Sequence, residues 1–189
     1  MKASAFVGTS LDGYLARPDG APDFLPLDGA EPHGHDEFMA SVDALIIGRN
    51  TYEVVVTFEA WPYADKPVFV LSTQALRTPP PVAVVERLSG TPQEGVATLA
   101  RPGFEHAYVD GGLTIQSFLH AGLIQCLTVT RVSVIIGTGI PLFGPTTPDV
   151  MLKHIETRQY TSGLVKSEYE VLASEWRARA SFRRKPRPC

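Results

Sequence analysis

The chain has little cysteine and no long apolar run. Two cysteines occur among its 189 residues, Cys126 within an apolar segment and Cys189 at the last position. This excludes a disulfide framework and leads us to expect a reducing, cytoplasmic environment. No apolar stretch approaches the roughly 20 residues that a membrane helix needs, and residues 1–8 are too short and too quickly polar for a signal peptide. We therefore expect no membrane partner.

Positive charge is scarce outside the C-terminal end. Six of the 17 basic residues lie within residues 173–189, which hold a single acid, so the rest of the chain carries a formal charge of −8. A basic tail can bind nucleic acid, but nothing else in the chain resembles a nucleic-acid-binding motif. We interpret residues 173–189 as a solvated basic tail and expect no nucleic-acid partner. Residues 1–172 are long enough to form one globular domain.

Apolar runs alternate with helix-like segments, which predicts an α/β fold. The early apolar runs do not alternate with polar residues, and this favours parallel strands buried on both faces. The last two are more polar and are joined by residues 161–163, which indicates an antiparallel hairpin. We expect a three-layer fold with a mixed, mostly parallel sheet between helices. The expected strands are 3–7, 44–47, 68–71, 82–85, 106–109, 123–132, 151–160 and 165–172, and the expected helices are 35–42, 51–56, 91–99 and 113–121.

The most informative motif is a pair of glycines between a strand and a helix. Asp110 follows the expected strand 106–109, Gly111 and Gly112 come next, and Leu113 begins the expected helix. Without Cβ atoms the backbone can approach a phosphate closely, and the free N–H groups of a helix start favour its negative charge. An ordinary tight turn is the alternative reading of the same residues.

Two further strand ends carry polar side chains. Residues 48–52 follow a buried strand, so Arg49 could pair with a phosphate, while Thr51 could cap the next helix or contact the same oxygen. Ser72 and Thr73 follow another strand, where small hydroxyls suit a ribose or its 2′-phosphate. A capped helix with a surface arginine and simple turn residues are the alternatives.

A long loop leaves the same expected sheet edge. Residues 10–16 contain an Asp-Gly turn, and a Gly- and Pro-rich stretch continues to residue 32. Loops of this length inside one domain commonly act as lids or substrate loops. We expect this loop to be functional.

Together these motifs resemble the dihydrofolate reductase-like superfamily, most closely the free-standing form of the reductase domain of riboflavin biosynthesis. The resemblance covers residues 2–172 and includes residues 137–143, which read Gly-Thr-Gly-Ile-Pro-Leu-Phe. It implies an NADPH-dependent reductase that transfers hydride to a C=N or C=O group of a small heterocyclic or imine substrate. The reaction type would be that of 5-amino-6-(5-phosphoribosylamino)uracil reductase. Alternatives are a dihydrofolate reductase and a non-catalytic NADP-binding protein.

The resemblance also implies which residues hold the cofactor. The Gly-Gly turn and helix start would bind the pyrophosphate, the second turn would bind the adenosine side, and the serine-threonine pair would flank the adenine and 2′-phosphate. The long loop would close over the nicotinamide. In this sequence these positions are Gly111, Gly112, Leu113 and Thr114; Gly48, Arg49 and Thr51; Leu71, Ser72 and Thr73; and Ala16 and Gly20.

The proton donor is less well defined. Folate-reducing relatives place a carboxylate on the first helix, where this chain has Asp36, although Asp36 also suits an N-cap or a first-turn acid. Asp12 is a second candidate catalyst and a candidate substrate contact. Asp110 is a further alternative for the proton donor, and it stands at the acidic position before the Gly-Gly turn, where the resemblance implies contact with substrate.

Two departures from the riboflavin enzymes bear on the substrate. Their Asn-Pro and Arg-rich segment, which holds a ribose phosphate, is replaced here by residues 54–62, an acidic and aromatic stretch. This argues against a phosphorylated sugar in that pocket. The chain also lacks the Cys-x-x-Cys of the zinc deaminase half. Phe24, Phe58, Trp61 and Tyr63 could line an aromatic pocket or pack in the core.

Residues 151–172 and 124–132 could support a homodimer.

Overall fold

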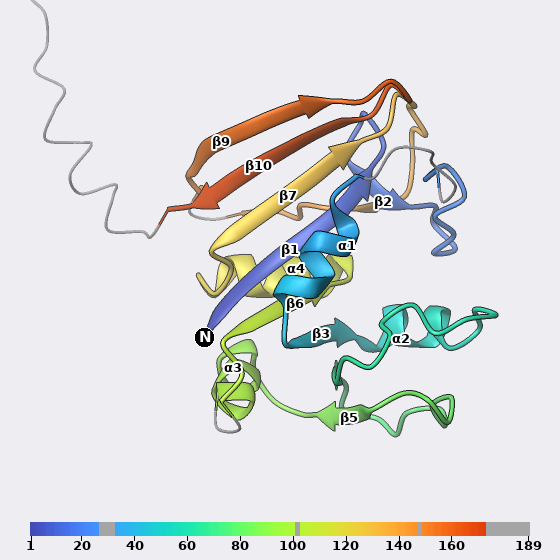
Figure 1. Ribbon diagram of the computed structural model, residues 1–189, viewed down its shortest axis with the longest axis vertical. Helices are drawn as coiled ribbons and strands as arrows, with labels where there is room; N and C mark the ends of the chain where they lie inside the picture. Colours follow the sequence, from blue (N-terminus) through green and yellow to red (C-terminus); the bar gives the residue numbers. More distant parts are fainter. Residues whose placement is uncertain (27–32, 101–102, 147–148, 173–189) are drawn as a thin grey trace, which may run out of the picture.

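A computed structural model describes residues 1–26, 33–100, 103–146 and 149–172. Eight strands form one sheet in the order β5-β4-β3-β6-β1-β7-β10-β9, and two short strands, β2 and β8, pair separately (Figure 1). The basic tail lies outside the described residues. The strands are β1 (Lys2–Thr9), β2 (Tyr14–Ala16), β3 (Ala44–Gly48), β4 (Val68–Leu71), β5 (Val85–Leu88), β6 (His106–Asp110), β7 (Cys126–Arg131), β8 (Ile140–Pro141), β9 (Leu152–Gln159) and β10 (Val165–Val171).

The sheet is parallel over six strands and antiparallel at one end. Strand β1 lies between β6 and β7 and pairs in parallel with both, with Ser4 opposite Tyr108 on one side and Cys126 on the other. Strands β3, β4, β5 and β6 continue the parallel part. Strand β10 then runs antiparallel to β7 and to β9. The expected mixed sheet with an antiparallel C-terminal hairpin is confirmed.

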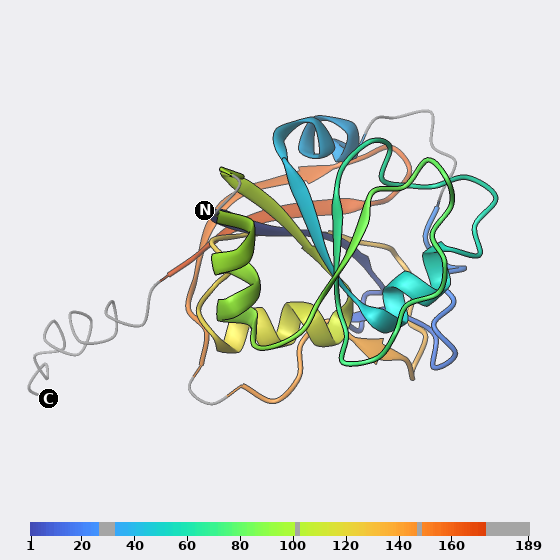
Figure 2. The ribbon, with the colours of Figure 1, turned by 90° about the horizontal axis from the view of Figure 1, so that it is seen from below.

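Four helices in the described part of the chain cover the parallel strands: α1 (His35–Ser41), α2 (Arg49–Val55), α3 (Pro92–Ala100) and α4 (Gly112–His120). Helix α1 lies on the opposite side of the sheet from α3 and α4 (Figure 2). Leu99 of α3 and Phe118 of α4 pack with Ile46 on one face, whereas Tyr52 of α2 packs with Ile47 on the other. Successive side chains of β3 therefore point into hydrophobic cores on opposite faces of the sheet. Because both faces are buried, the sequence of β3 is apolar without interruption.

Some predicted boundaries were wrong. The expected strand 82–85 is displaced, because β5 begins only at Val85, while Val82 and Val84 are 70% and 60% exposed. A turn that includes Pro80 and Pro81, closed by a hydrogen bond from Ala83 N to Pro80 O, delays the strand. Helix α2 begins at Arg49, two residues earlier than expected, and strands β2 and β8 were not predicted. No helix among the described residues is long and apolar enough to cross a membrane.

Candidate functional site

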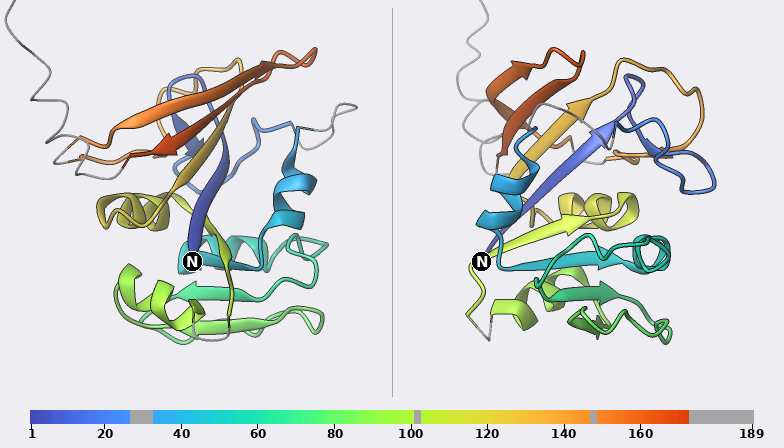
Figure 3. Two further views of the ribbon diagram at one scale, coloured as in Figure 1. Left: turned by 60° about the vertical axis from the view of Figure 1, so that its left-hand side comes forward. Right: turned by 45° about the vertical axis from the view of Figure 1, so that its right-hand side comes forward.

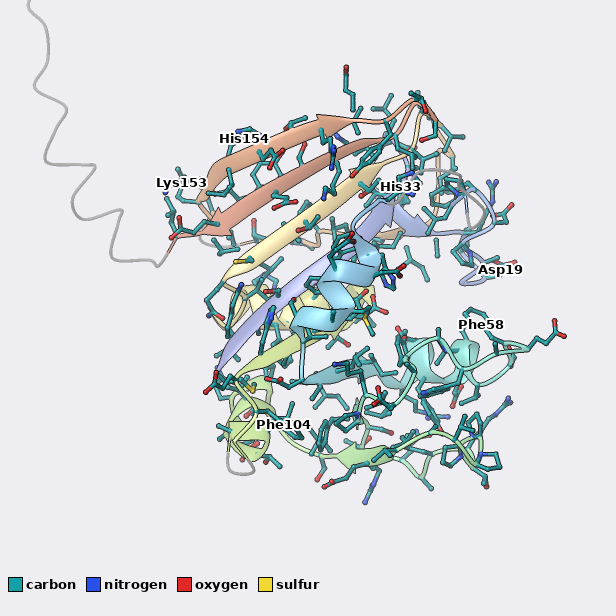
Figure 4. The ribbon with its side chains drawn as sticks, in the orientation of Figure 1. Asp19, His33, Phe58, Phe104, Lys153 and His154 are labelled. Carbon is teal, nitrogen blue, oxygen red and sulfur yellow. The ribbon has the colours of Figure 1, made fainter. Side chains whose placement is uncertain are left out.

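The predicted cofactor residues lie where the parallel strands end. Strands β1, β3 and β6 point the same way in the right-hand panel of Figure 3, so the turns that follow them emerge at one edge of the sheet. The loop with Asp19 and the loop with Phe58 lie on that side of the molecule in Figure 4. In open α/β sheets this edge is where ligands bind.

The two glycine turns at this edge contact each other. A Cβ placed on Gly111 would collide with Oγ1 of Thr51, and a Cβ on Gly48 would lie 2.6 Å from Oγ1 of Thr114. Gly111 also has φ +94°, a backbone conformation that side chains other than glycine rarely adopt. The first turn of each helix therefore packs against the glycine that precedes the other helix. The structure brings Gly48, Thr51, Gly111 and Thr114 together as the sequence predicted.

Both helices begin without a side-chain cap. The N-cap residues of α2 and α4 are Gly48 and Gly111, and neither makes a side-chain hydrogen bond to the helix. Of the two roles considered for Thr51, capping of α2 does not occur, because Thr51 lies inside the helix. Gly112 begins α4, and the side chain of Leu113 is 72% exposed. The start of α4 thus combines an uncapped first turn with two residues that carry no Cβ atom, as close approach of an anion to the backbone requires.

Arg49 and the residues after β4 form a hydrogen-bonded cluster. Arg49 Nε donates to Glu53 Oε1 at 2.7 Å, and Arg49 Nη1 donates to Gln74 Oε1. Gln74 N donates to Ser72 Oγ at 3.0 Å, while Ser72 Oγ donates to Gln74 O at 2.8 Å. Ser72 is half-buried and its neighbour Thr73 is exposed. The sequence placed Arg49, Leu71, Ser72 and Thr73 together, but it did not identify Glu53 or Gln74, although the i, i+4 spacing of Arg49 and Glu53 was a signal.

The loop after β1 packs across the start of α4. A Cβ on Gly112 would lie 3.2 Å from Leu15 Cδ1 and 3.1 Å from Ile140 Cγ2. Ala16 is buried and pairs with Ile140 in the β2–β8 ribbon. Gly20, with φ +92°, approaches Val54 of α2. The predicted loop positions therefore lie against both helices that begin at the sheet edge.

Asp12 fastens this loop to a second one. Its two carboxylate oxygens accept hydrogen bonds from Gly137 N at 2.8 Å and Ile136 N at 3.3 Å. A hydrogen bond from Ser10, followed by these backbone donors, holds the pKa of Asp12 below its usual value although desolvation opposes the shift. The ionised carboxylate is thus an acceptor that joins the loop after β1 to the segment before β8.

Asp110 has a different environment, among phenols. Its Oδ1 accepts a hydrogen bond from Gly111 N at 2.7 Å, and Tyr63 Oη lies 3.5 Å from its Oδ2. Burial raises the pKa of Asp110, although the Gly111 and Tyr63 donors act in the opposite direction. Burial and the nearby Asp110 charge raise the pKa of Tyr63 well above its usual value. The pKa of Asp110 is thus shifted in the opposite direction from that of Asp12.

Tyr63 was not predicted as a partner of Asp110. It follows α2 by several residues, and its ring packs edge-to-face with Trp61 at 5.2 Å between centroids. The next residue, Ala64, has φ +50°, the one positive φ among the described non-glycine residues. The strained backbone of Ala64 helps to set the path of the chain beside Tyr63. The aromatic side chains of residues 54–62 indicated an aromatic wall, which Trp61 and Tyr63 form. No pattern in the sequence indicated that Tyr63 contacts Asp110.

Asp36 lies in the first turn of α1, as one of the two sequence interpretations expected. The N-cap is Gly34, and the side chain of Asp36 is fully exposed, 3.8 Å from His35 Nδ1. Phe38 of the same helix instead faces the sheet and stacks on Phe6 at 5.1 Å. Helix α1 therefore presents an aromatic ring to the sheet and its first-turn carboxylate to solvent.

One protein family matches the chain over most of its length. The family model described as the RibD C-terminal domain matches residues 2–166. The chain belongs to the RibD C-terminal domain family. The protein YwjB of Bacillus subtilis (strain 168) is 30% identical over 166 residues, which is 84% of this chain and 92% of YwjB.

Solved structures agree with the family assignment. A protein from Shewanella sp. PV-4, assigned to riboflavin biosynthesis, is 35% identical with a TM-score of 0.84, over 92% of this chain and all of the Shewanella chain. Dihydrofolate reductase of Enterococcus faecalis, complexed with NADP(H), gives a TM-score of 0.61 at 15% identity, over 90% of this chain and 94% of that one. The dihydrofolate reductase-like fold is thus confirmed.

Proposed function

We propose that this chain is an NADPH-dependent reductase that transfers a hydride to the carbon of a C=N or C=O group in a small heterocyclic or imine substrate, in a reaction of the riboflavin-pathway type. The observation that carries the proposal is the contact between the Gly48–Thr51 and Gly111–Thr114 turns. Two uncapped helix starts at one sheet edge, with no Cβ at either turn, suit the pyrophosphate of a dinucleotide. Family membership and the NADP(H) complex of the Enterococcus enzyme support it.

The chain's residues would divide the work as follows. Gly111, Gly112, Leu113 and Thr114 would hold the pyrophosphate, and Gly48, Arg49 and Thr51 the adenosine side. Leu71, Ser72 and Thr73 would flank the adenine and its 2′-phosphate, and the loop with Ala16 and Gly20 would cover the nicotinamide. When bound, the cofactor supplies the hydride. The protein must then position the substrate and supply a proton to its nitrogen or oxygen.

We propose Asp110 as the group that contacts the substrate and delivers this proton. Its half-buried carboxyl lies beside the glycine turn, and its raised pKa favours the protonated form that can donate. Asp12 already accepts two backbone hydrogen bonds, which suits a residue that fixes the loop over the site. Asp36 projects into solvent, which suits a helix-start charge.

The aromatic wall of Trp61 and Tyr63 favours a flat, uncharged ring system as substrate. Trp61 Nε1 is buried and has no hydrogen-bond partner among the described residues, so this N–H is available to an acceptor atom. Segment 54–62 holds no arginine or lysine, so it offers no side-chain cation to a sugar phosphate. We propose that the substrate lacks a phosphate at this wall.

Thermal unfolding with NADPH or NADH tests the cofactor assignment. At one hundred times its dissociation constant, NADPH would stabilise the fold by about 2.7 kcal/mol. If neither NADPH nor NADH raises the midpoint of thermal unfolding, the reductase proposal is contradicted. That result would favour a protein that does not catalyse hydride transfer.

Oxidation of NADPH then tests the substrate class. The matched probes are 5-amino-6-(5-phosphoribosylamino)uracil, its dephosphorylated form and dihydrofolate. We expect the dephosphorylated pyrimidine to be turned over faster than its phosphate ester. Faster turnover of the ester would contradict the assignment at the aromatic wall, while preferred turnover of dihydrofolate would instead identify a folate reductase.

A further inference from the structure

The guanidinium of Arg49 is already paired with a carboxylate of the same helix. Arg49 Nε and Nη2 both approach Glu53 Oε1, at 2.7 and 2.6 Å. The two side chains are about one-third exposed, at 36% and 34%. Charge-assisted contacts of this length through two nitrogens hold an arginine more firmly than one exposed ion pair does. The charge of Arg49 is thus largely balanced within the protein.

A second acceptor holds the other side of the same group. Arg49 Nη1 donates to Gln74 Oε1, and Gln74 is fixed by its backbone N–H bond to Ser72 Oγ. A guanidinium has five N–H donors, and three of them are directed at Glu53 and Gln74. Two donors are left for a ligand. Arg49 is therefore oriented toward the loop after β4, but with its best bidentate edge taken by Glu53.

We infer that Glu53 is a specificity residue that limits the preference of this site for a 2′-phosphorylated dinucleotide over the unphosphorylated one. The inference rests on the proposed function, because it assumes that Arg49 faces the adenosine end of the cofactor. A phosphate that approaches Arg49 must compete with the Glu53 carboxylate and also meets its repulsion. A ribose with a free 2′-hydroxyl meets neither penalty, since a carboxylate accepts a hydrogen bond from a hydroxyl.

A further arginine, Arg87, lies beside the loop after β4. Arg87 is exposed, and its Nη1 donates a long hydrogen bond of 3.5 Å to Thr73 O. It provides a second cation for a phosphate beside Thr73. The site consequently keeps some preference for the phosphorylated dinucleotide, while Glu53 keeps that preference small.

The test compares dissociation constants of NADPH and NADH, and of 2′,5′-ADP and AMP as probes of the adenosine end, for wild type and Glu53→Gln. Glutamine keeps an oxygen acceptor for Arg49 but removes the charge. We expect Glu53→Gln to tighten NADPH and 2′,5′-ADP by about five- to tenfold and to leave NADH and AMP almost unchanged. The control is Glu170→Gln, which removes the same charge from the ion pair between Lys153 Nζ of β9 and Glu170 Oε2 of β10, 3.2 Å apart. It should change neither the NADPH to NADH ratio nor the 2′,5′-ADP to AMP ratio of dissociation constants.

The outcomes separate this inference from the proposed function. If wild type binds none of the four ligands, the reductase proposal and the inference both fall. If wild type binds NADPH but Glu53→Gln leaves the ratio unchanged or weakens NADPH, only the inference is overturned, and Glu53 instead orients Arg49. In an Arg49→Gln background, Glu53→Gln should have a much smaller effect. An undiminished effect there would also overturn the inference.

Discussion

The hydroxyl of Thr51 fills the space beside the Cα of Gly111, so that even a methyl group at Gly111 would collide with it. Thr51 belongs to the first turn of α2 and Gly111 is the N-cap of α4. The two helices that begin at the ligand edge of the sheet are thus held at a fixed separation by the absence of one side chain. Adding one methyl group at Gly111 would therefore disturb the packing of the two helix starts that form the proposed pyrophosphate site.

Gly111→Ala should therefore weaken both the fold and dinucleotide binding. Gly111 has φ 94° and ψ 132°, a sparsely populated backbone region that costs a residue with a Cβ atom about 1–3 kcal/mol, and the collision with Thr51 adds to this. Gly122→Ala is a matched control, since Gly122 has φ +68° but no neighbouring atom within 4 Å of the position that a methyl group would take. Urea unfolding with and without NADPH measures both effects. Equal losses of stability in the two variants would contradict the steric part of the argument.

Asp110→Asn should make the folded state more stable at neutral pH and less sensitive to pH. Burial raises the pKa of Asp110 above its unfolded value, so the stability contributed by its protonated form is complete below the unfolded pKa, which is near 3.9. It is lost as the pH rises through the folded pKa. Asparagine retains an acceptor for Gly111 N.

The measurement is the free energy of unfolding of both proteins from pH 4 to pH 8. We expect the advantage of Asp110→Asn to shrink as the pH is lowered. A constant difference across this range would show that Asp110 does not carry a raised pKa. The same variant should also lose most reductase turnover, whereas Asp36→Asn should retain it.

His106 should make the fold sensitive to mild acid. Its Nδ1 lies 2.9 Å from Ser41 O and must donate to that carbonyl, so its Nε2 accepts from Ser4 Oγ at 2.8 Å. Burial, which outweighs the Ser41 bond, lowers the pKa of His106. The stability of the neutral ring is complete above the unfolded pKa, near 6.5, and is lost as the pH falls through the folded pKa.

His106→Gln should remove part of the stability loss seen between pH 7 and pH 5. His154→Gln is the control, because His154 lies on the exposed strand β9, labelled in Figure 4. Thermal unfolding midpoints across this pH range measure the effect. If His154→Gln changes the pH profile as much as His106→Gln does, the partly buried imidazole is not its source.

Strand β9 is the surface at which we expect a homodimer. All eight of its residues are exposed, including Ile155 at 54% and Leu152 at 36%, and it lies at the edge of the sheet. Ile155→Lys should shift a dimer toward monomer, since it places a charge in an apolar contact. Light scattering after gel filtration measures the mass. Gln159→Lys on the same strand is the control for added charge.

Local sequence patterns predicted the sheet and the glycine turns because the responsible residues are neighbours in the chain. Continuous apolar runs identified β3, β4 and β6, and the Gly-Gly pair identified the start of α4. The contact of Tyr63 with Asp110 spans 47 residues and that of Arg49 with Gln74 spans 25. Such contacts depend on loop paths that spacing does not determine. The misplaced strand 82–85 has the same origin, since exposed valines after prolines resemble a buried strand.

The position of β1 has a consequence for how the chain can assemble during synthesis. Strand β1 pairs with β6 and β7, so Lys2 lies opposite His106 and Thr9 opposite Arg131. Strand β1 is therefore synthesised before both of its neighbours, and 96 residues separate its last residue, Thr9, from the first residue of β6, His106. Until a neighbour has been made, Ala3, Ala5 and Val7 have no sheet to join. Long-range pairing of this kind slows folding, and it leaves the apolar strand β1 exposed until residues 106–131 have been made.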